Sequence, residues 1–439
     1  MGIAETAKQA KKASIQLAAV KTDVKNAALA EIAKAIKQNA DKIISANKKD
    51  LADAEKNKLS TPLLKRLKFD ENKIADVAAG IESLIKLDDP VGKTLLATEL
   101  DKGLELYKVS CPIGVIGVIF ESRPDALVQI STLCLKSGNA VLLKGGSEAA
   151  NTNKILAKVI TEATEKAGIP IGWIQLLETR QDVAEMLKMD EDIDLIIPRG
   201  SNEFVRYIMD NTNIPVLGHA EGICHVYVDG AADIDMAVNI IVDSKCQYVA
   251  VCNAAETLLV DEKIAKQFLP KVKAALEDLS ACGGKGVELR GCKKTASIIK
   301  VKPATEKDWS TEYLDYILSI KVVNSVDEAI EHINRYSSRH TDAIVTEDKA
   351  TAAKFLDLVD SAGVFWNCST RFSDGYRYGL GAEVGISTNK IHARGPVGLE
   401  GLVIYKWKLL GSGQIVADYS GSKAKKFTHK KIQRSADSV

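Results

Sequence analysis

The sequence lacks any apolar run that approaches the roughly 20 residues of a membrane-spanning helix. Its N-terminal stretch has no uninterrupted apolar core, so it does not resemble a secretory signal. It also lacks an excess of charge, since 59 Lys and Arg residues against 58 Asp and Glu residues give a formal net charge of +1. These absences argue against a membrane protein and give no indication of a nucleic-acid partner. We therefore expect a cytoplasmic protein.

Paired, metal-binding cysteines are missing as well. The eight cysteines include no CxxC pair and show no regular spacing with histidines, so no metal site is expected. In a chain of this length they favour reduced thiols over a disulfide framework. Cys246 and Cys252 lie near the expected junction of two lobes and are the candidates for a nucleophile, which would need a lowered pKa and access. Whether Cys246 is simply packed or forms a disulfide stays open.

Internal repeats and low-complexity linkers are absent, and 439 residues suit two or three domains. Helical spacing of apolar residues predicts surface helices over 3–56 and a further helix over 71–86. Strands then alternate with helices, which predicts parallel, doubly wound sheets in two α/β lobes. The expected elements are strand 114–120, helix 124–136, strand 140–144, helix 148–167, strand 256–260, helix 262–278, strand 342–345, helix 348–359 and strand 363–366.

Several loops that follow strands carry residues able to bind anions, although none is a GxGxxG fingerprint. Lys144 to Ser147 and Arg199 to Ser201 each join a strand to a helix. Glycine permits close backbone approach there, and a helix N-terminus favours phosphate. "FESRPDA" places Arg123 at a helix start, and the long loop 365–398 is rich in glycine and arginine. Read one at a time, these loops are equally compatible with tight turns and surface ion pairs.

Taken together, "FESRPDALVQ", "LIIPRGSNEFV", "VCNAAETLLV", "STRFSDGYRYGLGAEVGIST" and "HARGPVGLEGL" resemble the gamma-glutamyl phosphate reductases, a family within the aldehyde dehydrogenase superfamily. The resemblance runs in order from the first helix to about residue 415. It implies two doubly wound parallel-sheet lobes plus a small oligomerisation β-flap. The implied domains are an NADP-binding domain at 1–98 and 112–221, a catalytic domain at 222–401, oligomerisation strands at 99–111 and 402–415, and a C-terminal tail at 416–439, whose basic end we expect to be solvated and mobile.

The resemblance also implies the chemistry. The motif cysteine matches Cys252, whose thiolate would attack L-glutamyl 5-phosphate, release phosphate and form a thioester. NADPH would then deliver hydride and yield L-glutamate 5-semialdehyde, the second step of proline biosynthesis from glutamate. The backbone N–H of Cys252 is the expected first oxyanion donor. Arg123 stands where hydrolytic relatives have an asparagine, and Gly218 stands where they have a glutamate base, so water activation is not expected.

Other residues match cofactor and substrate positions. Those implied for cofactor binding are Lys144, Gly146, Ser147, Gly200, Ser201 and Glu312. Ser147 replaces the acidic residue that holds the ribose of NAD in relatives, which favours NADP, although Glu148 is adjacent. Those assigned to substrate recognition, from charge and loop position, are Arg371, Asp374, His392 and Arg394.

Two alternatives remain open at this stage: another acylating or hydrolytic aldehyde dehydrogenase, and a non-catalytic scaffold member of the family. The resemblance implies a homodimer or homotetramer that pairs through the strands near 402–410 and 99–111. The chain has no room for the kinase that makes the labile acyl phosphate, so a separate glutamate 5-kinase is a possible partner. Neither nucleic acid nor membrane is an expected partner.

Overall fold

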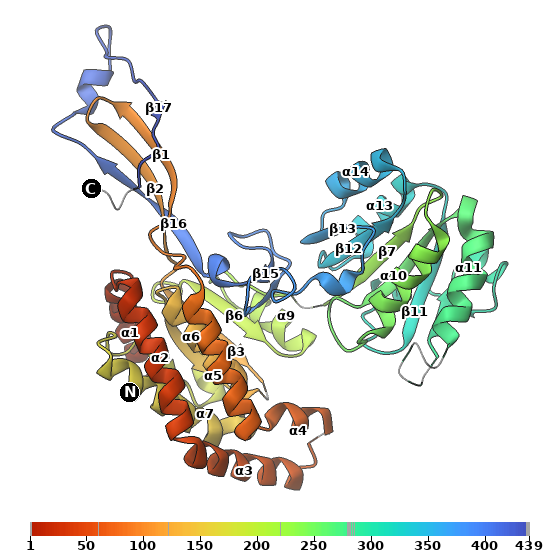
Figure 1. The fold of residues 1–439 in the computed structure, drawn as a ribbon, viewed down its shortest axis with the longest axis horizontal. Helices are drawn as coiled ribbons and strands as arrows, with labels where there is room; N and C mark the ends of the chain where they lie inside the picture. The colour runs from red at the N-terminus through yellow and green to blue at the C-terminus, as the bar shows by residue number, and fades with distance from the viewer. Residues whose placement is uncertain are drawn as a thin grey trace.

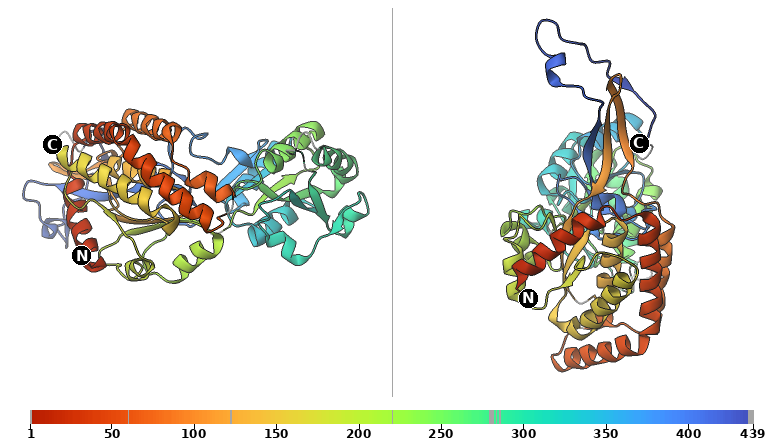
Figure 2. Two further views of the ribbon diagram at one scale, coloured as in Figure 1. Left: turned by 90° about the horizontal axis from the view of Figure 1, so that it is seen from below. Right: turned by 90° about the vertical axis from the view of Figure 1, so that its left-hand side faces the viewer.

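The computed structural model describes residues 2–435, apart from 60, 122, 220, 279–281, 283 and 285. Two α/β lobes and a β-flap that projects away from them make up the molecule (Figure 1). The right-hand view of Figure 2 shows the end of the flap projecting beyond both lobes. The expected fold class, two lobes with parallel sheets plus a small flap, is confirmed. Within the described part of the chain, no helix combines the length and apolar character needed to cross a membrane.

The N-terminal lobe wraps helices around a four-stranded parallel sheet of order β5-β4-β3-β6. Its central strands are fully buried, which is what helices on both faces of a sheet require. The apolar core joins sheet and helices and also takes in Val384 and Leu402 from the C-terminal part of the chain. The elements are α1 (Ile3–Leu17), α2 (Thr22–Gln38), α3 (Ala40–Lys56), α4 (Thr61–Leu67), α5 (Glu71–Lys86), β3 (Val115–Phe120), α6 (Pro124–Lys136), β4 (Ala140–Lys144), α7 (Ala150–Lys166), β5 (Ile174–Leu176), α8 (Arg180–Met186), β6 (Leu195–Arg199) and α9 (Asn202–Asp210).

The second lobe has a seven-stranded parallel sheet of order β10-β9-β11-β8-β7-β12-β13. Separate apolar clusters fill its two faces, and Figure 1 shows helices on both sides of it. A two-stranded antiparallel ribbon, β14-β15, follows this sheet in the chain. The elements are β7 (Cys224–Val228), α10 (Ile234–Cys246), β8 (Ala255–Asp261), α11 (Glu262–Glu277), β9 (Glu288–Gly291), α12 (Lys293–Ala296), β10 (Lys302–Pro303), β11 (Ile317–Val323), α13 (Val326–Tyr336), β12 (Thr341–Val345), α14 (Lys349–Leu358), β13 (Gly363–Trp366), β14 (Gly385–Ser387) and β15 (Gly395–Val397).

The flap is an antiparallel sheet of order β16-β2-β1-β17. Its strands are β1 (Thr94–Asp101), β2 (Leu104–Pro112), β16 (Val403–Leu410) and β17 (Lys430–Lys431), so β1 starts ahead of the residue 99 expected. The basic residues of the tail are exposed, as expected, but the tail also makes hydrogen bonds to the flap. Thr428 N–H donates to the Leu100 carbonyl and Tyr419 donates to Asp101, each at 2.8 Å. These backbone and side-chain bonds hold the tail against β1.

One pair of cysteines corrects the expectation of reduced thiols. Cys246, at the end of α10, is joined to Cys282 by a disulfide with the two Cα atoms 4.8 Å apart. The two lie 36 positions apart in the sequence, and only packing of α10 beside α11 brings them together. The described free cysteines are Cys111, Cys134, Cys224, Cys252, Cys292 and Cys368.

Asp50 ties α3 to the start of α7. Its buried carboxylate accepts hydrogen bonds from the backbone N–H groups of Asn151 and Thr152, at 3.1 and 2.8 Å. We expect Asp50→Ala to lower the free energy of unfolding of the N-terminal lobe by about 3 kcal/mol, because it leaves buried donors without acceptors. Urea denaturation followed by circular dichroism measures this change. Asp53→Ala, at an exposed position of the same helix, should change it by no more than about 0.5 kcal/mol, and equal effects would contradict the assignment.

Candidate active site around Cys252

Cys252 lies in the short turn between α10 and β8. A buried ion pair joins the two ends of this turn, since Lys245 Nζ lies 2.5 Å from Glu256 Oε2 and both side chains are fully buried. From the other side, the backbone at Gly222 packs against the turn so closely that a Cβ there would meet the Cys252 carbonyl oxygen at 2.2 Å. Only glycine permits this approach, and the position of the thiol is therefore fixed by the surrounding chain.

Two histidines converge on the thiol. His340 Nε2 lies 3.2 Å from Cys252 Sγ, and the rings of His219 and His340 pack edge to face with centroids 5.1 Å apart. Burial lowers the pKa of both imidazoles, that of His340 well below its usual value. Both rings are therefore neutral at physiological pH. A neutral His340 can accept the thiol proton.

The thiol itself is held in its protonated form. Burial, followed by the nearby carboxylates Glu312 and Glu383, raises the pKa of Cys252 to about 12. Arg371 acts in the opposite direction, but its effect is smaller. The thiol of the ligand-free protein is thus a weak nucleophile that needs a proton acceptor and a change in its surroundings to react.

The loop after β13 is hydrogen-bonded to the turn that carries Cys252. Thr370 donates to the Asn253 carbonyl at 2.7 Å, and the Asn253 amide donates to the Ser373 carbonyl at 2.8 Å. Arg371, expected to bind substrate, is buried and donates from Nε to Gln247 at 2.9 Å. Asp374, also expected there, accepts from backbone N–H groups two and three residues later, so it shapes the loop. Arg371 and Asp374 are the chain neighbours of Thr370 and Ser373, which make the hydrogen bonds to the Cys252 turn.

His392 and Arg394 line a different pocket, which the Cys252 turn does not line and which lies near Leu87 and Glu400. His392 Nε2 is 2.9 Å from the Gly401 carbonyl oxygen. Arg394 pairs with Asp360 at 3.2 Å. The structure thus separates these two from Arg371 and Asp374, and the substrate role of each stays a prediction.

The loops expected to hold the cofactor lie at the carboxyl ends of β4 and β6. Gly145 and Gly146 let neighbouring side chains lie directly against the backbone, since an added Cβ would meet Asn153 or the Glu148 carboxylate at 2.1 Å. Lys144 is buried beside them and donates to the Gly145 carbonyl at 2.5 Å. The Asn153 carbonyl oxygen is buried and accepts no hydrogen bond from the described residues. A turn with two glycines, a cation and an orphaned acceptor form a cradle that fits a nucleotide cofactor.

The second cofactor loop supplies a contact between the lobes. Ser201 caps α9, and at Gly200 an added Cβ would meet Phe204 at 2.9 Å. Asn202, next in the chain, donates to Glu312 of the second lobe at 2.6 Å. Glu312 therefore lies beside the loop of Gly200 and Ser201, with which it was predicted to bind the cofactor.

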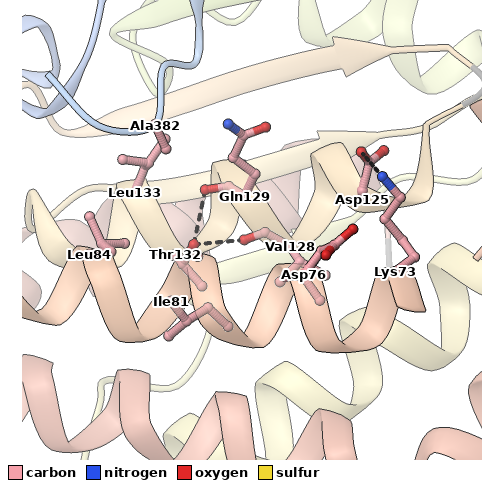
Figure 3. A pocket seen from close by; sticks show the side chains of 12 residues that line it. Lys73, Asp76, Ile81, Leu84, Asp125, Val128, Gln129, Thr132, Leu133 and Ala382 are labelled. Carbon is pink, nitrogen blue, oxygen red and sulfur yellow. Dashed lines mark hydrogen bonds and ion pairs between the residues drawn. The ribbon is translucent and has the colours of Figure 1, made fainter. Parts of the chain in front are cut away.

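Arg123 opens onto a pocket that also contains Arg199, Asp374 and Glu383. Burial, and then the charge of Arg123, lower the pKa of Arg199. A second pocket, between α5 and α6, continues from it through the shared lining residues Gly80, Leu84, Gln129 and Ala382. Figure 3 shows this pocket, with Lys73 and Asp125 paired at one end of it. The two pockets together form a groove with several charged side chains.

Sequence reasoning missed His340, His219 and Glu383 as site residues, and it named Arg199 only as part of a loop able to bind anions. A usable signal existed for His340. His340 directly precedes β12, and Cys252 lies three positions before β8. The strands β8, β7 and β12 are neighbours in one parallel sheet. Residues that precede adjacent parallel strands meet at the same sheet edge. The strand order, however, had to be known first.

Comparison with known proteins agrees with this arrangement. Residues 2–290 match the model of the aldehyde dehydrogenase family, and the chain belongs to that family. Within it the chain falls among the gamma-glutamyl phosphate reductases, which confirms the resemblance. It is 68% identical to gamma-glutamyl phosphate reductase of Acetivibrio thermocellus, over 99% of both chains, and 66% identical to that of Pelotomaculum thermopropionicum, over 99% and 98%. The crystal structure of gamma-glutamyl phosphate reductase from Thermotoga maritima superposes with a TM-score of 0.91 at 43% identity, covering 94% of this chain and 100% of that one.

The raised pKa of Cys252 can be tested through the pH dependence of its alkylation. With a pKa of about 12, the thiolate fraction and hence the rate of inactivation by iodoacetamide should rise about tenfold per pH unit between pH 7 and pH 10. The measurement is loss of activity in ligand-free protein at several pH values, with Cys292→Ser as the control for an unrelated free thiol. A plateau near pH 8.5, the value for an ordinary cysteine, would contradict burial of the thiol.

Proposed function

We propose that the protein reduces L-glutamyl 5-phosphate to L-glutamate 5-semialdehyde with NADPH and releases phosphate, the second step of proline biosynthesis from glutamate. The observation that carries this proposal is the Cys252 thiol at 3.2 Å from a neutral His340, in a chain 68% identical to a gamma-glutamyl phosphate reductase. The cradle at Lys144 to Ser147 supports a nucleotide cofactor.

The chain's own residues account for proton movement in the reaction. His340 accepts the Cys252 proton as Sγ attacks the acyl carbon, and phosphate leaves to give a thioester on Cys252. When bound, NADPH supplies the hydride that reduces this thioester to a hemithioacetal. The hemithioacetal then collapses to the semialdehyde, and the proton held by His340 returns to the sulfur. We assign the Cys252 backbone N–H and Arg123 as the donors for the developing oxyanion.

The surroundings of the thioester favour phosphate over water as the acyl acceptor. Gly218 provides no carboxylate where hydrolytic relatives have their base, and its carbonyl accepts from Thr388 N–H at 3.3 Å. Arg123 and Arg199 line one pocket and offer two cations for an acyl phosphate or for free phosphate. A hydrolytic aldehyde dehydrogenase is therefore the weaker alternative.

The reverse reaction tests the function. Pyrroline-5-carboxylate, in equilibrium with the semialdehyde, should drive NADPH formation from NADP⁺ only when phosphate is present, and Cys252→Ala should abolish it. The measurement is absorbance of NADPH with purified protein. Turnover that does not need phosphate would mean that water takes the thioester. Absence of turnover in folded wild-type protein would remove the proposed substrate.

The groove between α5 and α6 suits the amino-acid end of the substrate. Asp125 Oδ2 lies 3.6 Å from Lys73 and 3.5 Å from Arg123, whereas its buried Oδ1 accepts no hydrogen bond from the described residues. An unpaired carboxylate oxygen costs free energy that a bound ammonium group would recover. We infer that Asp125 binds the α-ammonium group and that Lys73 lies beside the α-carboxylate, as the arrangement in Figure 3 permits. This inference adds to the roles predicted for Arg371, Asp374, His392 and Arg394.

Asp125→Asn tests the inferred contact. Loss of a charge-assisted hydrogen bond should raise the KM for the semialdehyde about 10-fold or more, with a smaller change in kcat, because the acyl end of the substrate is untouched. Steady-state kinetics of the reverse reaction measure both constants. Glu82→Gln, at an exposed position of α5, is the matched control and should leave both unchanged. An unchanged KM in Asp125→Asn would show that the ammonium group binds elsewhere.

NADPH, rather than NADH, is the proposed cofactor. Ser147 stands in place of the carboxylate that would repel a 2′-phosphate, which supports NADP, while the Glu148 carboxylate folds over Gly146 at the edge of the same cradle. Kinetics with NADP⁺ and NAD⁺ compare the two cofactors directly.

The edge strand of the flap indicates how copies of the chain would associate. β16 is an edge strand, and its exposed side chains include Tyr405, Trp407 and Leu409. Edge strands with exposed apolar residues pair readily with another chain, so we propose a homodimer or homotetramer that forms through β16. A separate glutamate 5-kinase as the supplier of the labile acyl phosphate, and a cytoplasmic location, remain proposals from the sequence and the family.

A further inference from the structure

Three ligand atoms of the active site meet in the geometry of a metal centre. Cys252 Sγ and one ring nitrogen from each of His219 and His340 lie within 4.8 Å of one another. The closest pair, Cys252 Sγ and His340 Nε2, is 3.2 Å apart. Tetrahedral zinc with bonds of about 2.3 Å to sulfur and 2.0 Å to nitrogen holds such atoms roughly 3.5 Å apart. A shift of about 1 Å among the three side chains would bring their ligand atoms to these distances.

In both His219 and His340, Nδ1 contacts the surrounding protein, so Nε2 is the nitrogen that can bind a metal. His219 Nδ1 lies 3.0 Å from the Ile386 carbonyl oxygen, so this nitrogen carries the proton and Nε2 is a free acceptor. His340 Nδ1 lies 2.9 Å from the Thr341 hydroxyl, and its Nε2 faces the thiol. Metal-binding histidines are held in this way, with the second nitrogen bonded to a carbonyl, a hydroxyl or a carboxylate.

Protonation states favour metal ligation as well. Burial keeps both imidazoles neutral, which is the form that binds metal. Cys252 is only half-buried, so a small cation can reach it and keep a fourth position open to water. Spacing along the chain does not indicate such a site, because its members lie far apart, at 219, 252 and 340.

We propose that Cys252, His219 and His340 form a binding site for one zinc ion, and that zinc there inhibits the enzyme reversibly by occupying the nucleophile. Binding replaces the thiol proton, so Cys–SH and Zn²⁺ give a Cys–S–Zn⁺ centre and release one proton. The sulfur lone pair that would attack the acyl carbon is then committed to the metal. Metal binding does not depend on the proposed function, whereas the inhibition does.

The test is Co²⁺ titration of tag-free protein, followed by displacement with Zn²⁺. Wild type should bind one equivalent of Co²⁺ and show thiolate-to-cobalt charge-transfer absorption in the near ultraviolet. Cys252→Ala should lose this band, and His219→Ala or His340→Ala should weaken Zn²⁺ binding by about 100-fold, since even an outer-contact change costs 10- to 100-fold. Thr341→Val, which removes only the outer contact of His340, should weaken it by about 10-fold.

Controls separate this site from other thiols. Cys292 is the first competitor, because hydrogen bonds from Thr295 lower its pKa although burial opposes them. Cys246 and Cys282 would form a dithiol if their disulfide were reduced. Cys292→Ser, Cys282→Ser and the exposed-histidine variant His392→Gln should therefore keep the band and the affinity. A band that survives Cys252→Ala, or that disappears in Cys282→Ser, would overturn the proposal, as would zinc inhibition unchanged in His219→Ala.

Discussion

The close approach of Gly222 to the Cys252 turn is the constraint on which the active site depends. No side chain fits between the two backbones, because a Cβ at Gly222 would meet Cys252 Cα at 2.3 Å. The ion pair of Lys245 and Glu256 holds the same turn at its two ends. With the backbone fixed from both directions, the thiol lies 3.2 Å from His340 Nε2.

Burial at this position sets the chemistry. It raises the pKa of the thiol and lowers the pKa of the imidazoles, so that all three groups are neutral in the ligand-free protein. A neutral thiol next to a neutral base is protected from adventitious oxidation and alkylation, yet a single proton transfer activates it. Neutral imidazoles, together with a thiol that gives up its proton on binding, are ligands that zinc prefers, which is why one geometry supports both catalysis and the inhibition proposed here.

The two lobes meet through opposite ends of their sheets. The cofactor loops follow the carboxyl ends of β4 and β6, as expected for an open α/β sheet. Cys252 and His340 precede β8 and β12, so the second lobe contributes the amino ends of its strands. Asn202 and Glu312 bridge the two edges. The site therefore exists only where the lobes come together, and residues from four distant parts of the chain share it.

Local patterns were enough to place much of the fold. Apolar periodicity and caps predicted α5 and α6 with their observed limits, because Pro124 begins one helix and Gly138, at a φ of 76°, follows the end of the same one. The patterns did not reveal β9, β11 or α13, which lie between 279 and 340. They also did not predict the pairing of β17 with β1, since a two-residue strand has no periodicity to detect.

By itself the sequence determined the family and predicted the nucleophile and the cofactor loops, because each of these depends on contiguous residues whose local conformation needs no distant partner. Tertiary structure alone decided the rest. His219 and His340 became partners of Cys252, Cys246 was joined to Cys282, and His392 and Arg394 were separated from Arg371. The contacts among these join residues that lie 33 or more positions apart in the chain, and strand order and helix packing, not local propensity, bring such residues together.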